Sequence, residues 1–158
     1  MKNLLILLLF VSFSVIGQSQ IINGIELNSP KEMVKVGNLT WEDEKNSLTV
    51  IPLKQISTKK QKETAVKRGN RYLELIFSHN VESLGESNHI AIFKSLEKVG
   101  NITLFQGQVM IQQGDYEYLI VSTSISSGGK NEDENAIATI HRILGYMMAK
   151  IIDPIYVN

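Results

Sequence analysis

Residues 102–125 read ITLFQGQVMIQQGDYEYLIVSTSI, and this stretch decides the fold. The turn pair Gly114-Asp115 separates two runs that are rich in β-branched and aromatic residues, Ile102 to Gln112 and Tyr116 to Ile125. Two such runs joined by a short turn are typical of an antiparallel β-hairpin. The sequence therefore predicts two long neighbouring antiparallel strands.

The second run of this hairpin is apolar on both of its faces. Successive side chains of a strand point to opposite sides, so Tyr118 and Ile120 face one way while Leu119 and Val121 face the other. A strand with two apolar faces needs a covering layer on each side, unlike a meander that is solvated on one side.

Four further segments have the pattern of strands. Gly100-Asn101 is a tight turn that joins the segment His89 to Val99 to the long hairpin. The other three are short and partly alternating, and lie near the N-terminus: Gly24 to Leu27, Gly37 to Glu42 and Leu48 to Leu53.

The C-terminal segment has the period of an amphipathic helix. Asn131 is expected to cap its start, with Glu134 completing an arrangement like a capping box, and Asp153-Pro154 ends it. Its apolar stripe consists of Ile137, Ile140, Leu144, Met147, Met148 and Ile151. Arg142, Tyr146 and Lys150 are expected on the opposite, polar side.

A second amphipathic helix is predicted over Thr58 to Phe77. Its apolar arc consists of Ala65, Val66, Gly69, Tyr72, Leu73, Ile76 and Phe77. Its opposite arc is basic, and this candidate partner-binding face consists of Lys60, Lys67, Arg68 and Arg71. An ordinary solvated helix face is the alternative, because Glu63 forms a favourable i,i+4 pair with Lys67.

Together these elements predict an α+β domain with a mainly antiparallel sheet of six or seven strands and helices on both faces, an α/β/α sandwich. One helix follows the early strands, and the other ends the chain.

The N-terminal 20 residues have the pattern of a secretory signal. Lys2 precedes an apolar run from Leu4 to Phe10, and polar residues follow at Gln18-Ser19-Gln20. The run is shorter than the ~20 residues that cross a bilayer. We expect a signal peptide over residues 1–19, removed near Gly17 to Ser19, and a periplasmic or secreted protein.

The composition suits one folded domain over residues 20–158. The 16 basic and 16 acidic residues balance, so no general field attracts nucleic acid. Cysteine is absent from the sequence, which excludes disulfides, thiol nucleophiles and a lipid-modified cysteine.

No motif of known chemistry stands out. The three histidines, His79, His89 and His141, lack the spacing of a zinc site, and no Gly-x-Ser-x-Gly elbow is present. Gly128-Gly129-Lys130 lacks the Walker pattern, and the acidic residues after it would repel phosphate. The sequence therefore offers no catalytic residue, cofactor-binding residue or metal ligand, and no cofactor is expected.

The order of elements resembles the PsbP-like fold, which is shared by PsbP, the Ran-binding Mog protein and exported bacterial proteins. The resemblance is carried by GIELNSP at Gly24 to Pro30, Leu39-Thr40-Trp41, ITLFQGQ at Ile102 to Gln108, YEYLIVS at Tyr116 to Ser122, and the two helices. It implies an α/β/α sandwich and a role in binding or assembling other proteins.

The leading hypothesis is an exported, non-catalytic binding or assembly module with an envelope or extracellular protein as its partner. A cofactor-free secreted hydrolase is one alternative, and it would need His141 beside a serine and a buried carboxylate. A carrier of a small apolar ligand is the other, with a pocket lined by Met147 and Met148.

Overall fold

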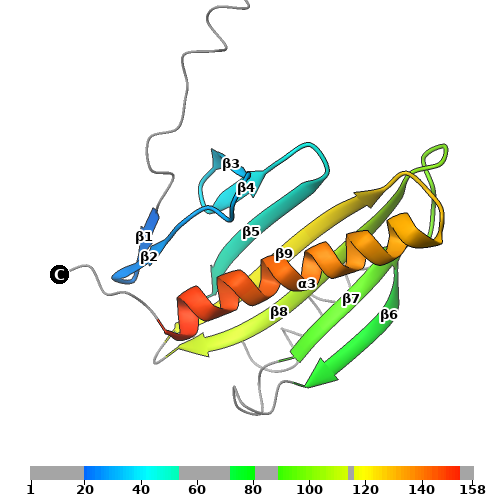
Figure 1. The fold of residues 1–158 in the computed structure, drawn as a ribbon. Helices are drawn as coiled ribbons and strands as arrows, with labels where there is room; N and C mark the ends of the chain where they lie inside the picture. The colour runs from blue at the N-terminus through cyan, green and yellow to red at the C-terminus, as the bar shows by residue number, and fades with distance from the viewer. Residues whose placement is uncertain (1–19, 54–71, 81–88, 114–115, 154–158) are drawn as a thin grey trace, which may run out of the picture.

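The computed structural model of the protein describes residues 20–53, 72–80, 89–113 and 116–153. These residues form a seven-stranded sheet, a small two-stranded sheet and one long helix (Figure 1). In the large sheet the strand order is β3-β4-β5-β9-β8-β7-β6, and all neighbours are antiparallel. The strands are β3 (Val34–Gly37), β4 (Thr40–Glu42), β5 (Asn46–Leu53), β6 (Leu73–Asn80), β7 (His89–Ser95), β8 (Thr103–Gln113) and β9 (Tyr116–Ser126).

The central hairpin matches the sequence prediction. Strands β8 and β9 pair over their whole length, from Thr103 opposite Ser126 to Gln113 opposite Tyr116. The preceding turn is also present, because Gly100 adopts a φ of 64° and Val99 bridges to Ile102. The predicted α+β class with a seven-stranded antiparallel sheet is therefore confirmed.

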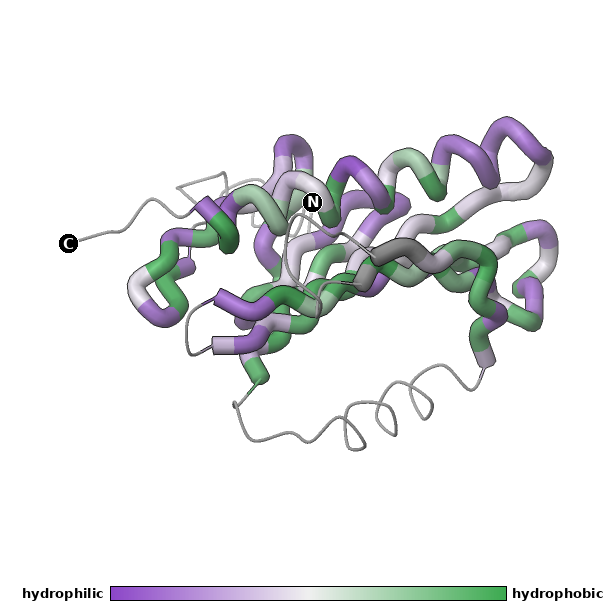
Figure 2. Tube along the Cα trace, turned by 90° about the horizontal axis from the view of Figure 1, so that it is seen from below, coloured by the Kyte–Doolittle hydropathy of each residue, from purple (hydrophilic) through white to green (hydrophobic). Residues whose placement is uncertain are grey.

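Helix α3 (Lys130–Ile152) crosses one face of this sheet (Figure 1). In side view, helix and sheet form two layers, with hydrophobic residues concentrated in the strands (Figure 2). The buried helix residues are Ala136, Ile140, Ile143, Leu144, Met147, Met148 and Ile151. This agrees with the predicted stripe except that Ala136 and Ile143 are also buried and Ile137 is only half-buried.

The helix approaches the sheet most closely above Gly107 of β8. A Cβ atom at this position would lie 2.2 Å from Ile140 Cγ2 and 2.8 Å from Leu144 Cδ1. Gly107 therefore leaves the space into which two core side chains of α3 fit. Strand β9 contributes small polar residues beneath the same helix, with Ser122 and Ser124 buried.

A separate hairpin precedes the main sheet. Strand β1 (Gln20–Ile22) pairs with β2 (Ile25–Leu27) through a turn in which Asn23 and Gly24 have φ angles of 50° and 79°. Left-handed conformations at both central residues match the twist of a tight hairpin. The side chains of β2 enter the core beside α3, so this hairpin closes one end of the core.

The predicted single strand over Gly37 to Glu42 is wrong. The chain turns within it, because Leu39 has a φ of 56° and separates β3 from β4. Leu39 is itself buried, so its side chain enters the core from a turn position. The pair Gly37-Asn38 directly before Leu39 is a turn signal that the strand prediction passed over.

The predicted helix over Thr58 to Phe77 is wrong in its last part. Residues from Leu73 onward form strand β6, which pairs with β7 and has an irregular register between Leu75 and Phe77. The run LELIF is compatible with either period, and pairing along β7 decides it. Residues 58–71 lie outside the described residues, so the described structure has α3 on one face and no second helix. In the described part of the chain, no helix has the length and hydropathy to cross a membrane.

Replacing Gly107 by alanine should destabilise the fold by about 1–3 kcal/mol, because its Cβ would overlap Ile140 and Leu144 in a packed core. The matched control is Gly145→Ala on the exposed side of α3, where an added Cβ meets nothing within 4 Å. That change should stabilise the helix by about 0.5–1 kcal/mol. Urea unfolding measures both, and equal stabilities for the two variants would contradict the packing argument.

Candidate functional site

A groove of about 240 Å³ opens beside the solvent-facing side of α3. One wall is the loop of residues 30–33, and another is the turn between β4 and β5, represented by Asp43 and Asn46. The third wall is α3, through Thr139, Arg142, Ile143 and Tyr146. Two segments from the N-terminal part of the chain and the C-terminal helix thus enclose one concave surface with a mixed polar and apolar lining.

The turn between β4 and β5 is held by a single carboxylate. Asp43 Oδ1 accepts hydrogen bonds from the backbone N–H groups of Lys45 and Asn46, each at 2.8 Å. Asn46 Nδ2 donates to both carboxylate oxygens at 2.9 Å. All of these donors belong to the turn that contains Asp43. The main role of the Asp43 carboxylate is therefore to fix the shape of this wall.

The loop wall contains an unfavourable backbone conformation. Met33 N–H donates to Pro30 O at 3.2 Å, and Ser29 Oγ donates to Met33 O, so the loop is a closed turn. Within it Glu32 has a φ of 74°, which favours glycine and costs a side chain about 1–2 kcal/mol. The turn therefore displays an exposed carboxylate at the groove rim at the expense of stability.

Tyr146 fastens this loop to the helix. Its hydroxyl donates to Ser29 O at 3.3 Å, across 117 positions of sequence. Burial raises the pKa of the Tyr146 hydroxyl above its ordinary value, because the phenolate would lose water on this half-buried site. Lys150 Nζ lies 5.7 Å from the centre of the Tyr146 ring and covers it from the next turn of α3.

Two cations at the groove are unpaired in the described structure. Lys31 and Arg142 are exposed and make no hydrogen bond or ion pair with any described residue. Met33 and Ile143, which are 6% and 4% exposed, also line the groove and supply part of its apolar surface. The groove thus combines free donors with a small apolar floor.

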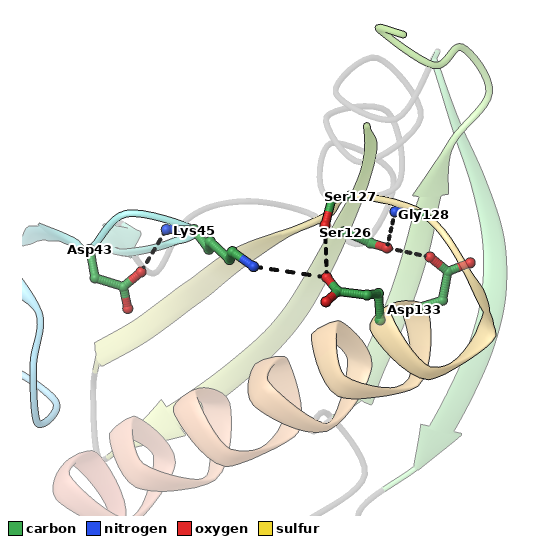
Figure 3. A network of polar contacts seen from close by, with 7 residues as sticks. Asp43, Lys45, Ser126, Ser127, Gly128 and Asp133 are labelled. Atoms are coloured by element: carbon green, nitrogen blue, oxygen red, sulfur yellow. Dashed lines mark hydrogen bonds and ion pairs between the residues drawn. The ribbon is translucent and has the colours of Figure 1, made fainter. Parts of the chain in front are cut away.

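A second polar cluster at the start of α3 has a structural role (Figure 3). Ser126 Oγ donates to Asp133 Oδ1 at 2.6 Å and accepts from Gly128 N–H at 3.2 Å. Next to it, Ser127 Oγ donates to Glu132 Oε2 at 3.0 Å. Lys45 Nζ lies 3.8 Å from the same Glu132 oxygen, so this cluster links the β4–β5 turn to the helix.

The predicted cap of this helix is wrong. Asn131 lies inside α3, and the N-cap is Gly129 with a φ of 95° and no side-chain cap bond. Acidic side chains of the first turn are bound instead by the serines at the end of β9. Glu134, expected in a capping box, pairs with Lys130 at 3.8 Å. Carboxylates already favour the positive end of the helix dipole, which removes the need for an amide cap.

The predicted basic face, Lys60, Lys67, Arg68 and Arg71, lies outside the described residues. His141 is exposed on α3 and packs edge-on against Phe77, with ring centres 5.5 Å apart. Met147 and Met148 are buried in the core rather than in a pocket. Among the described residues, no three histidine or acidic side chains are grouped to hold a metal ion.

Sequence reasoning missed the groove. It placed Arg142 correctly on the exposed side of α3, but Tyr146, expected on the polar side, is half-buried and packs against the core. The sequence does not show that the loop of residues 30–33 lies next to α3, since only the fold brings Lys31 and Glu32 beside the helix. The one available signal was Ser29-Pro30, which marks a turn but not its neighbour.

Comparison with known proteins identifies the fold. No protein-family model matches the chain, and no curated protein matches it significantly. The solved structures that resemble this chain have the Mog1-like α+β architecture. The Ran-binding protein Mog1p of Saccharomyces cerevisiae is similar with a TM-score of 0.54 and 12% identity, over 87% of this chain and 95% of that one. The structure of a mutant of protein Mog1 is similar with a TM-score of 0.53 and 12% identity, over 86% of this chain and 95% of that one. The predicted Mog/PsbP-like fold is therefore confirmed.

Stability should fall at alkaline pH through Tyr146. Because its pKa is raised in the folded state, the unfolded chain loses this proton first, so its contribution is full below about pH 10 and is lost as pH rises through the folded-state pKa. Tyr146→Phe should reduce this alkaline loss and cost about 0.5 kcal/mol at neutral pH through the bond to Ser29.

Urea unfolding from neutral to alkaline pH checks this expectation, with Tyr116→Phe as control because Tyr116 is exposed at the start of β9. An alkaline loss that is the same in the Tyr146→Phe and wild-type proteins would contradict the role given to this hydroxyl.

Proposed function

We propose that the protein is an exported, non-catalytic binding or assembly module that holds an envelope or extracellular protein through the groove beside α3. Residues 20–158 form the working domain in the periplasm or outside the cell, after removal of a signal peptide over residues 1–19 near Gly17 to Ser19. Two facts support this proposal: the chain shares the fold of a protein described as Ran-binding, and its N-terminus has the charge and apolar run of a secretory signal.

The groove carries the proposal because its size and lining suit the side chains of a partner. Its volume of about 240 Å³ is below the roughly 300–1,000 Å³ of typical small-molecule pockets. Its rim carries exposed charged groups, Lys31, Glu32 and Arg142. Such an open groove of mixed polar and apolar lining, with charged residues at its rim, supports recognition of a protein surface more than enclosure of an apolar ligand.

The geometry gives little support to the hydrolase alternative. The described serine–carboxylate pair nearest the helix is Ser126 with Asp133, at the start of α3. His141 lies eight positions further along, or ~12 Å of helix rise. Its ring faces Phe77 of β6.

We further propose that residues 54–71 cover the second face of the sheet. Four antiparallel steps separate β5 from β6, so these two strands are parallel and their connection must cross a face of the sheet. Such connections are right-handed in about 98% of cases. Viewed as in Figure 1, with α3 in front, a right-handed passage from β5 to β6 runs behind the sheet.

The described residues of that face support a covering layer. Met110, Leu119 and Val121 point away from α3 and are half-buried, and Phe93 beside them is only 7% exposed. With Val66 of the predicted helix against this surface, the basic arc that includes Lys67 would face outward. The candidate face of Lys60, Lys67, Arg68 and Arg71 would then be a second contact surface, on the side opposite the groove.

Single cysteines test this arrangement, because the chain has none of its own. Val66→Cys should react with a thiol reagent at least ten times more slowly than the adjacent Lys67→Cys, since only the first is expected against the sheet. The labelling rate in the native protein is the measurement, and both variants are first compared with wild type by circular dichroism. Equal rates would contradict the second covering layer.

Site-specific cross-linking in the producing cells tests the function. A photoreactive residue in place of Thr139, on the groove wall, should join the protein to one defined envelope protein. The same residue in place of Lys98, exposed after β7 and outside the groove lining, should not. Equal cross-linking from both positions, or turnover of ester or glycoside substrates that Ser126→Ala abolishes, would contradict the binding proposal.

A further inference from the structure

We propose that the groove recognises a carboxylate side chain of the partner protein, with Arg142 as its principal ligand. This inference rests on the proposed binding function and names the chemistry that the partner must present. Three observations carry it. Arg142 and Lys31 have no partner among the described residues, Asp43 is engaged by its own turn, and the lining includes apolar residues.

Arg142 is placed to bind rather than to stabilise the fold. It is exposed on α3, lines the groove, and makes no hydrogen bond or ion pair with a described residue. Thr139 and Tyr146, three positions before and four after it, lie on the same side of the helix and line the same groove. A guanidinium offers two parallel N–H donors that match a carboxylate, and the neighbouring hydroxyls add further hydrogen-bonding groups.

The opposite wall supplies the second cation. Lys31 is exposed on the loop that Tyr146 holds against the helix through Ser29 O. Since the β4–β5 turn and the loop are closed by their own hydrogen bonds, the walls need little reorganisation when a ligand enters. Lys31 and Arg142 thus line one groove from two of its walls, and we expect both to attract a small anion that enters it.

The acidic residues of the groove limit which anion fits. Asp43 is engaged by N–H groups of its own turn, and Glu32 is exposed beside Lys31. Two cations and two carboxylates give the lining a formal charge of zero. A phosphate dianion would meet repulsion from both carboxylates, whereas a singly charged carboxylate is held by directed hydrogen bonds with less of that repulsion.

The apolar floor favours an acidic side chain over a bare ion. Met33 and Ile143 line the same groove and supply part of its apolar surface. The methylene groups of a glutamate pack on such a surface while its carboxylate reaches the donors. A protein partner presenting an exposed glutamate therefore fits the groove.

Nuclear magnetic resonance of the purified, isotopically labelled protein tests the assignment. The probes are a blocked pentapeptide with a central glutamate between alanines, the same peptide with glutamine, and inorganic phosphate. The glutamate peptide should produce saturable shifts at Thr139, Arg142 and Tyr146 and bind about fivefold more tightly than its glutamine twin. Arg142→Gln should remove that preference, while the control Lys98→Gln, outside the groove lining, should keep it.

Three results would overturn the assignment: equal affinities for both peptides, shifts that lie elsewhere, or a preference that survives in folded Arg142→Gln. Tighter binding of phosphate than of the glutamate peptide would assign the groove to another anion and overturn it too. The cross-linking experiment separates this failure from that of the function. If the photoreactive residue at position 139 still captures one envelope protein, the binding module stands without the carboxylate.

Discussion

The close packing of α3 on the sheet above Gly107 sets the geometry of the molecule. Ile140 and Leu144 enter the space that a glycine leaves on β8, which fixes both the height and the rotation of the helix. Because one side of the helix is committed to the core, residues that flank this side face solvent or the neighbouring N-terminal segments. Thr139, Arg142 and Tyr146 therefore line the groove as a consequence of how the core is filled.

The two polar clusters beside α3 illustrate how structure and recognition divide the charged residues. At the helix start, Asp133 and Glu132 accept hydrogen bonds from serines, and Lys45 lies next to Glu132, so these charges are used within the fold. At the groove, Arg142 and Lys31 have no such described partners. A charge that is satisfied internally stabilises a local arrangement, whereas an unsatisfied donor in a preformed concavity retains its capacity for a ligand.

The sequence predicted those parts of the fold that depend on local pattern. The hairpin of β8 and β9 and the stripe of α3 follow from alternation, turn residues and helical period. The strand β6 was assigned to a helix because LELIF fits both periods, and its pairing with β7 is a tertiary effect. The other two misses are local. The chain turns at Asn38 and Leu39 just after Gly37, and serines five to seven positions earlier bind the carboxylates at the start of α3 in place of the expected Asn131 cap.

The sequence did not predict the groove, because only the fold brings the N-terminal segments beside α3. One wall of the groove nevertheless has an unusual backbone conformation. Glu32 occupies a left-handed conformation that glycine would adopt at lower cost, within a turn closed by Met33 and Pro30. The turn thus carries a carboxylate where glycine would be more stable. Placed beside Lys31, that carboxylate lowers the attraction of the groove for doubly charged anions. In the proposed site, Glu32 on the strained turn thus contributes selectivity against doubly charged anions, and Arg142 on α3 contributes the binding.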